Sequence, residues 1–177
     1  MPEVLVVDAS AGIALAREEM TAPSVRAILQ QARRAGGRLL VPSVFWLEIV
    51  NVLAMRYRLA PAEVTRGIVH LERTGLETVE PGRSLLLLTL DVVGQHRLAA
   101  YDAAYVALAR ALDGRLVTLD RTQARAAGDR AILAGGGHLL AEAAPPYGTS
   151  VAGPSGDWPG AAAYLRLLRP RRIGPTP

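Results

Sequence analysis

The 177-residue chain contains neither cysteine nor lysine. Without cysteine it can form no disulfide bond, no zinc–thiolate centre and no thiol nucleophile, and nothing in it requires an oxidising compartment. All 20 cationic side chains are arginine, which together with abundant alanine, glycine and proline indicates a GC-rich genome. The missing lysine also argues against a response-regulator receiver domain, because such a domain combines acidic residues at strand ends with a lysine late in the chain.

Long apolar segments are missing as well. No apolar run approaches the roughly 20 residues that a membrane-spanning helix needs. The first residues, Met1-Pro2-Glu3, are followed by only four apolar residues before Asp8, which is unlike a signal peptide. Half of the residues are nevertheless hydrophobic, and the length suffices for one domain with a core of its own. We therefore expect a folded cytoplasmic protein with no membrane partner.

The most informative feature that is present is a set of four acidic residues placed in or directly after hydrophobic segments: Asp8, Glu48, Asp102 and Asp120. A carboxylate beside such a segment is drawn towards the interior, where an isolated negative charge is costly. Several carboxylates can share one site at neutral pH when a divalent cation neutralises them, and oxygen ligands suit Mg²⁺ or Mn²⁺. The set therefore indicates metal-assisted chemistry on phosphoesters.

Each acid taken alone also has a purely structural explanation, because aspartate is common in turns and at helix caps. Glu48 is the strongest single case. It falls within the apolar half of a predicted helix, with Val44, Leu47 and Val50, and a glutamate in such a position needs a partner. The three histidines are scattered without the spacing of metal ligands, so we expect them to be solvated or packed in the core.

Hydrophobic periodicity and turn residues predict strands that alternate with helices. The predicted strands are 4–7, 38–41, 76–79, 115–119 and 138–140, and the predicted helices are 11–19, 24–35, 43–57, 61–73, 84–96, 103–112 and 122–133. Such alternation is typical of an α/β fold whose parallel sheet is covered by helices on both faces. Asp8 and Asp120 then end strands and Asp102 begins a helix, so we expect these acids to meet at one rim of the sheet.

The composition changes towards the C-terminus. Residues 145–177 are rich in proline, glycine and arginine, and they carry four arginines against Asp157 alone. A short helix over 161–168 is compatible with the pattern but too short to be stable alone. We therefore predict a domain over residues 1–144, followed by a flexible tail over 145–177.

Four segments together resemble the PIN-domain family and, within it, the VapC-type toxins of prokaryotic toxin–antitoxin pairs. Each segment alone is a weak signal, whereas their order and spacing over residues 1–140 make the resemblance specific. It implies a PIN-like three-layer fold with a mostly parallel central sheet flanked by helices. The four segments are Val6-Val7-Asp8-Ala9-Ser10, Pro42 leading to Glu48-Ile49-Val50-Asn51-Val52-Leu53, Tyr101-Asp102-Ala103-Ala104-Tyr105-Val106-Ala107-Leu108-Ala109, and Val117-Thr118-Leu119-Asp120.

The resemblance also implies a site and its chemistry. Family members are metal-dependent ribonucleases, so Asp8, Asp102 and Asp120 would coordinate Mg²⁺ or Mn²⁺. Glu48 would complete the catalytic set by holding a water or a second metal ion. The implied function is an endoribonuclease toxin of a type II toxin–antitoxin system, cleaving RNA such as tRNA with metal-activated water. The hydroxyl groups of Ser10 and Thr118 would form hydrogen bonds with the carboxylates or with the scissile phosphate.

The implied partners are an RNA substrate, a small cognate antitoxin and a second copy of the chain in a homodimer. Two other functions stay open at this point: a PIN nuclease in RNA processing without a toxin role, and a catalytically silent PIN-like scaffold that binds RNA or protein. The complete set of four acids argues against the scaffold, because a scaffold needs none of them. One metal ion and two are both compatible with the set.

Overall fold

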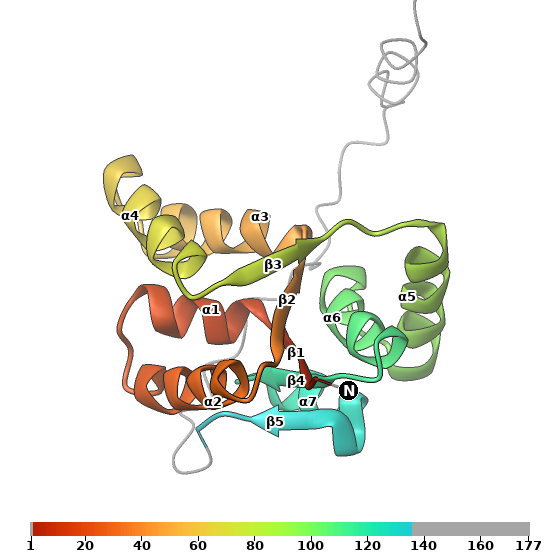
Figure 1. Ribbon diagram of the computed structural model, residues 1–177. Helices are drawn as coiled ribbons and strands as arrows, with labels where there is room; N and C mark the ends of the chain where they lie inside the picture. The colour runs from red at the N-terminus through yellow and green to blue at the C-terminus, as the bar shows by residue number, and fades with distance from the viewer. Residues whose placement is uncertain (1, 136–177) are drawn as a thin grey trace, which may run out of the picture. The chain divides into compact units, whose positions relative to one another are not determined.

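The computed structural model describes residues 2–135. Within that range five strands form a single parallel sheet in the order β3-β2-β1-β4-β5 (Figure 1). The α/β fold predicted from the sequence is thereby confirmed. The strands are β1 (Val4–Val7), β2 (Arg38–Pro42), β3 (Leu76–Val79), β4 (Arg115–Thr118) and β5 (Ala131–Leu133).

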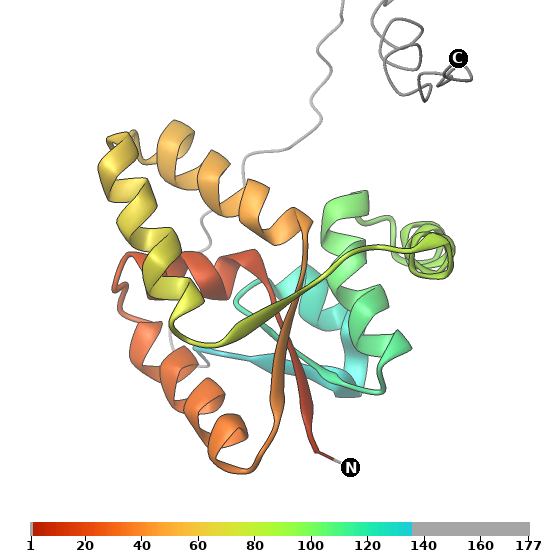
Figure 2. The same cartoon turned by 45° about the horizontal axis from the view of Figure 1, so that its top comes forward.

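Helices cover both faces of the sheet, with α1 to α4 on one side and α5 to α7 on the other (Figures 1 and 2). This division follows from the strand order, because right-handed crossovers that move in opposite directions along a sheet fall on opposite faces. No helix in the described range is long and apolar enough to cross a membrane. The helices are α1 (Ala9–Ala16), α2 (Ala22–Arg34), α3 (Val44–Asn51), α4 (Pro61–Glu72), α5 (Arg83–His96), α6 (Ala100–Ala111) and α7 (Arg121–Ala127).

Strand β1 is the centre of the molecule. It pairs with β2 on one side and β4 on the other, and its Leu5, Val6 and Val7 are fully buried. A continuous apolar run is what a strand covered on both faces requires. After β1 the chain forms β2 and then β3 on one side of it, and only then forms β4 on its other side. The strand order therefore reverses between β1 and β4. Ligands of such sheets bind beyond the strand ends at this reversal.

The structure corrects the prediction at the end of the described range. The helix predicted over 122–133 is wrong: α7 ends at Ala127, a 3-10 turn follows over Gly128–Arg130, and β5 takes the remaining residues. Gly128 has φ +60°, a conformation that ends a helix and suits glycine. The predicted strand 138–140, the helix 161–168 and the boundary at residue 144 lie outside the described residues.

The predicted apolar side of the helix over 43–57 is wrong for Leu47 and Val50. Leu47 is 71% exposed and Val50 is 40% exposed, while the buried side chains are Phe45, Ile49 and Leu53. The buried residues recur every four positions, and the helix changes to a π-helical turn over Val52–Arg56. Glu48 therefore lies at the edge of the buried face and is half-buried.

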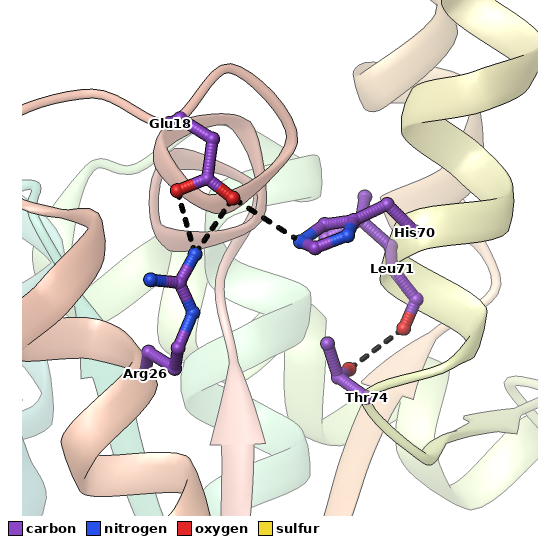
Figure 3. A network of polar contacts seen from close by, with 5 residues as sticks. All are labelled: Glu18, Arg26, His70, Leu71 and Thr74. Atoms are coloured by element: carbon purple, nitrogen blue, oxygen red, sulfur yellow. Dashed lines mark hydrogen bonds and ion pairs between the residues drawn. The ribbon is translucent and has the colours of Figure 1, made fainter.

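Polar contacts connect the end of α1 with α2 and α4 (Figure 3). The Arg26 guanidinium donates to both carboxylate oxygens of Glu18, at 2.7 and 2.6 Å, and His70 Nε2 lies 3.7 Å from the same carboxylate. Thr74 closes the end of α4 by donating to the Leu71 carbonyl at 2.7 Å. These groups are largely exposed, and exposed ion pairs contribute little to stability, so packing of the apolar faces holds the helices together.

Gly12 of α1 is a point of close approach between helices. A Cβ atom there would lie 2.6 Å from Phe45 Cζ and 2.7 Å from its Cε2, and the Phe45 ring is fully buried. The ring also makes an edge contact with Trp46, with centroids 5.0 Å apart. Neither α1 nor α3 has free space to accept a methyl group at this contact.

We expect Gly12→Ala to lower the free energy of unfolding by about 1–2 kcal/mol, because overpacking outweighs the gain in helix propensity. Gly94→Ala in α5 is the matched control, since nothing lies within 4 Å of the added Cβ. That variant should gain about 0.5–1 kcal/mol. Urea denaturation of both variants measures the difference. Equal stabilisation by the two substitutions would show that α1 and α3 can move apart freely.

Candidate active site

Asp8 is the most buried of the four acids, with 2% of its surface exposed. It follows β1 directly, its backbone N–H donates to the Val117 carbonyl of β4 at 3.0 Å, and it is the N-cap of α1. Strand pairing thus fixes its backbone, and the helix start fixes its side chain. The carboxylate therefore lies at the point where the strand order reverses.

Two hydroxyl groups hold the Asp8 carboxylate. The Thr118 hydroxyl at the end of β4 donates to Asp8 Oδ2 at 2.9 Å and accepts from the Asp120 backbone N–H at 2.9 Å. The Ser10 hydroxyl also donates to Asp8 Oδ2 and accepts from the Leu119 N–H at 2.9 Å. The structure therefore places both predicted hydroxyls on this carboxylate, where they also join the ends of β1 and β4.

Gln123 connects Asp8 with Asp102. Its side-chain Nε2 lies 3.1 Å from Asp8 Oδ1 and 3.1 Å from Asp102 Oδ1, and Gln123 is 3% exposed. Asp102 stands in the first turn of α6, a helix that packs against β1 and β4. Gln123 was absent from the residues predicted for the site. The available signal was its position three residues after Asp120, which places it in the first turn of α7.

Asp120 lies beside this pair as the N-cap of α7. Its Oδ1 accepts from the backbone N–H groups of Thr122 at 2.6 Å and Gln123 at 3.0 Å. The cap orients the first turn of α7 and, with it, the Gln123 side chain. The negative charge of Asp120 also acts on Asp102 and contributes to the raised pKa of that residue.

Glu48 approaches from the opposite side, on α3. The hydroxyl of Tyr105 donates to Glu48 Oε2, and Tyr105 is fully buried in α6. Tyr105 was part of a recognised segment but was not predicted as a site residue. It positions one oxygen of Glu48 and leaves Oε1 as the other acceptor of that carboxylate.

Electrostatics joins the four acids into one unit. Burial, followed by the charges of Asp8 and Asp120, raises the pKa of Asp102 to about 6. Burial also raises the pKa of Glu48 to about 7, with further contributions from Asp8 and Asp102. Burial raises the pKa of Asp8, and its hydrogen bonds oppose that effect. The carboxylates therefore repel one another in the absence of a counter-charge.

The donor set fits a divalent cation in its chemistry, although the described residues contain no preformed group of three or more acidic or histidine ligands. The fit rests on two observations. Oxygens of Asp8 and Asp102 converge on a single nitrogen, that of Gln123, and the oxygen of the same buried amide has no partner among the described residues. Hard carboxylate oxygens held together at a repulsive distance are the ligands that Mg²⁺ and Mn²⁺ prefer.

Comparison with known proteins shows the family of the chain. Residues 5–129 match the family described as the PIN domain. The chain belongs to the PIN domain family. PIN domains are generally nucleases and usually use divalent metal ions, so a nuclease-type function follows for this PIN domain.

A solved structure agrees at the level of the fold. The crystal structure of PAE2754 from Pyrobaculum aerophilum superposes with a TM-score of 0.56 and 24% sequence identity, covering 75% of this chain and 85% of that one. At this identity the likeness concerns the fold alone. No curated protein sequence matches the chain at a significant level.

The raised pKa values predict an unusual pH dependence for the metal-free PIN domain. Asp102 and Glu48 titrate near 6 and 7 in the folded state, above their ordinary values of 3.8 and 4.5. Between about pH 4 and pH 7 the folded state therefore holds more protons than the unfolded state, so the free energy of unfolding falls as the pH rises through this window. In EDTA, we expect these two groups to lower the melting temperature progressively between about pH 4 and pH 7.

Asp102→Asn tests the cause, because it removes the charge and keeps an oxygen that accepts from Gln123. Its melting temperature in EDTA should exceed that of the wild type by a few degrees at about pH 8, and the difference should disappear as the pH falls below the ordinary pKa of 3.8. Asp91→Asn, on the exposed surface of α5, is the control and should follow the wild type. An Asp102→Asn variant that melts below the wild type at about pH 8 would show that Asp102 is stabilised by its surroundings.

Proposed function

We propose that this PIN domain is a metal-dependent endoribonuclease that hydrolyses phosphodiester bonds of RNA. The observation that supports it best is the convergence of Asp8 and Asp102 oxygens on one buried nitrogen, with Asp120 and Glu48 acting on the same charges. A structural role explains the one buried carboxylate, that of Asp8, but not the neighbouring carboxylates of Asp102 and Glu48, whose pKa values are raised by burial and by nearby acids. Retaining such repulsion is costly unless a cation relieves it.

The residues divide the chemistry between them. Asp8, Asp102 and Asp120 would hold Mg²⁺ or Mn²⁺, which supplies positive charge for the phosphate and an acidified water. The Ser10 and Thr118 hydroxyls keep Asp8 in one orientation. The groups that contact Asp8 thus have the role of positioning its carboxylate for the cation.

Glu48 suits the role of general base. Its pKa of about 7 lies close to neutral pH, where a base can both accept and release a proton. Tyr105 occupies Oε2, so Oε1 would take the proton of the attacking water. The water oxygen forms a new bond to phosphorus while the bond from phosphorus to the departing ribose oxygen breaks, and that oxygen is protonated by solvent.

Cleavage of total RNA, followed by electrophoresis, tests this proposal. We expect cleavage with Mg²⁺ or Mn²⁺, none in excess EDTA, and a loss of more than about 100-fold in Asp8→Asn. Asp91→Asn should cleave like the wild type. Cleavage that persists in excess EDTA would refute the metal-dependent mechanism, and an inactive wild type that binds metal would favour a silent binding scaffold.

We further propose that the nuclease acts as a toxin neutralised by a small antitoxin. A groove of about 480 Å³ lies where α2 and α4 meet and contains none of the four acids. Its lining combines the arginines Arg26, Arg33 and Arg73, of which Arg26 is paired with Glu18, with an apolar floor to which the largely buried Leu15 and Leu29 contribute. An amphipathic segment with acidic side chains complements such a surface in both hydrophobicity and charge.

Controlled expression in a bacterial host tests the toxin role. We expect growth to stop within a few generations when the wild type is expressed, and to continue with Asp8→Asn expressed at the same level. Co-expression of the product of a short neighbouring reading frame should restore growth. A nuclease that cuts RNA in vitro but leaves growth unaffected would instead indicate a role in RNA processing.

A further inference from the structure

The amide of Gln123 occupies an unusual position between two carboxylates. Its nitrogen lies at the same distance, 3.1 Å, from Asp8 Oδ1 and Asp102 Oδ1. Ionised carboxylates only accept hydrogen bonds, so the end of the amide that faces them is the NH₂ group, with one hydrogen for each oxygen. The amide thus gives these carboxylates two donor contacts at the place where their charges converge.

The other end of the amide is poorly satisfied. Gln123 Oε1 is buried and has no hydrogen-bond partner among the described residues. A buried acceptor without a donor destabilises the structure, so this arrangement does not optimise the amide itself. The benefit lies entirely at the nitrogen, which interacts with Asp8 and Asp102.

The backbone of Gln123 is held independently of its side chain. Its N–H donates to Asp120 Oδ1 at 3.0 Å, in the first turn of α7. Rotation about the side-chain bonds can therefore withdraw the amide without moving the helix. Asp8 stays in place because Ser10 and Thr118 hold its other oxygen, Oδ2.

We propose that Gln123 is a positioning residue that takes the place of the cation in the metal-free protein. Its amide holds Asp8 and Asp102 together through two hydrogen bonds and withdraws when a divalent cation binds to the same two oxygens. The inference rests on the proposed function, because the cation is the one proposed there. Gln123 then stabilises the metal-free state and weakens metal binding by the same factor, since both effects express one interaction that only the metal-free state makes.

This role differs from that of a metal ligand. A ligand contributes to the metal-bound state, so its removal weakens binding. A residue that contributes only to the metal-free state strengthens binding when it is removed. The sign of the change in metal affinity therefore separates the two roles without reference to catalysis.

Titration calorimetry with Mn²⁺ on the full chain, at about pH 8 where the acids are ionised, provides the test. Gln123→Met keeps the length of the side chain and removes the amide, and Gln123→Leu is a second variant with the same loss. We expect the Mn²⁺ dissociation constant to fall at least about tenfold in both, because the loss of even one hydrogen bond to a charged group predicts a change of that size. Their melting temperatures should fall in EDTA and approach that of the wild type at saturating Mn²⁺.

Gln95→Met is the matched control. Gln95 also donates its amide to a carboxylate, that of Asp91 at 2.7 Å, but on the exposed surface of α5 and without a hydrogen bond to any of the four acids among the described residues. Its Mn²⁺ affinity should equal that of the wild type. A parallel increase in Gln95→Met would show that the effect is a general result of losing an amide, which would overturn the proposal.

Two other outcomes would also overturn it. An unchanged Mn²⁺ dissociation constant in the Gln123 variants would mean that the amide only packs in the core, and a larger constant would mean that Gln123 is itself a ligand. The failure of the proposed function looks different: either the wild type binds no Mn²⁺ at all, or it binds Mn²⁺ normally and leaves RNA uncut.

A measurement on the wild type keeps the test independent of substitution. Hydrogen exchange of the Gln123 side-chain amide, followed by nuclear magnetic resonance, should be slow in EDTA and at least about tenfold faster with saturating Mg²⁺, because the amide leaves its buried acceptors. Exchange that stays equally slow with Mg²⁺ bound would mean that the amide remains between the carboxylates, contrary to the proposal.

Discussion

The rest of the site depends on one unfavourable interaction, the repulsion between the buried carboxylate of Asp8 and the carboxylates around it. Asp8 is almost completely removed from water at the end of the central strand. Hydroxyl and amide donors from Ser10, Thr118 and Gln123 compensate this charge. Burial still dominates, and the pKa of Asp8 is raised. The fold therefore keeps several carboxylates close together, although the substitution of a single acid would relieve the repulsion between them.

The topology makes this concentration possible. Because the strand order reverses between β1 and β4, the ends of these strands leave room for groups from helices on both faces of the sheet. Asp102 comes from α6 on one face and Glu48 from α3 on the other (Figure 2). The parallel strands β1 and β4 fix the positions of Asp8 and Asp120, which follow them. The start of α6 fixes Asp102, and the hydrogen bond from Tyr105 of α6 orients Glu48 of α3. No contiguous segment of the chain could bring such groups together.

The sequence predicted four of the five described strands, and the strand ends and helix start that carry Asp8, Asp120 and Asp102, because these depend on local patterns. A short apolar run that ends in aspartate is a local signal, and two such runs gave the ends of β1 and β4. The prediction of which face of α3 is buried was wrong because this helix carries apolar residues on all sides. Periodicity therefore could not distinguish the exposed Leu47 from the buried Ile49. Only the tertiary packing of Phe45 against Gly12 decides which side is inside.

Gln123 and Tyr105 show a different limit of sequence reasoning. Each lies on a helix whose pattern is satisfied without assigning it a role. Tyr105 becomes informative only through its contact with Glu48, and Gln123 only through its contacts with Asp8 and Asp102. Strand β5 is a related case: its three residues fit the apolar pattern of a longer α7, but Gly128 ends the helix before them and they pair with β4 instead. Long-range pairing overrides local propensity at these positions.

The central claim is that the repelling carboxylates are kept for a cation, and anomalous X-ray diffraction from crystals soaked in Mn²⁺ tests it most directly. The account predicts an anomalous peak within coordinating distance of oxygens from both Asp8 and Asp102, with the Gln123 amide no longer between them. A peak elsewhere on the protein with none between Asp8 and Asp102, or an amide that stays in place, would contradict it.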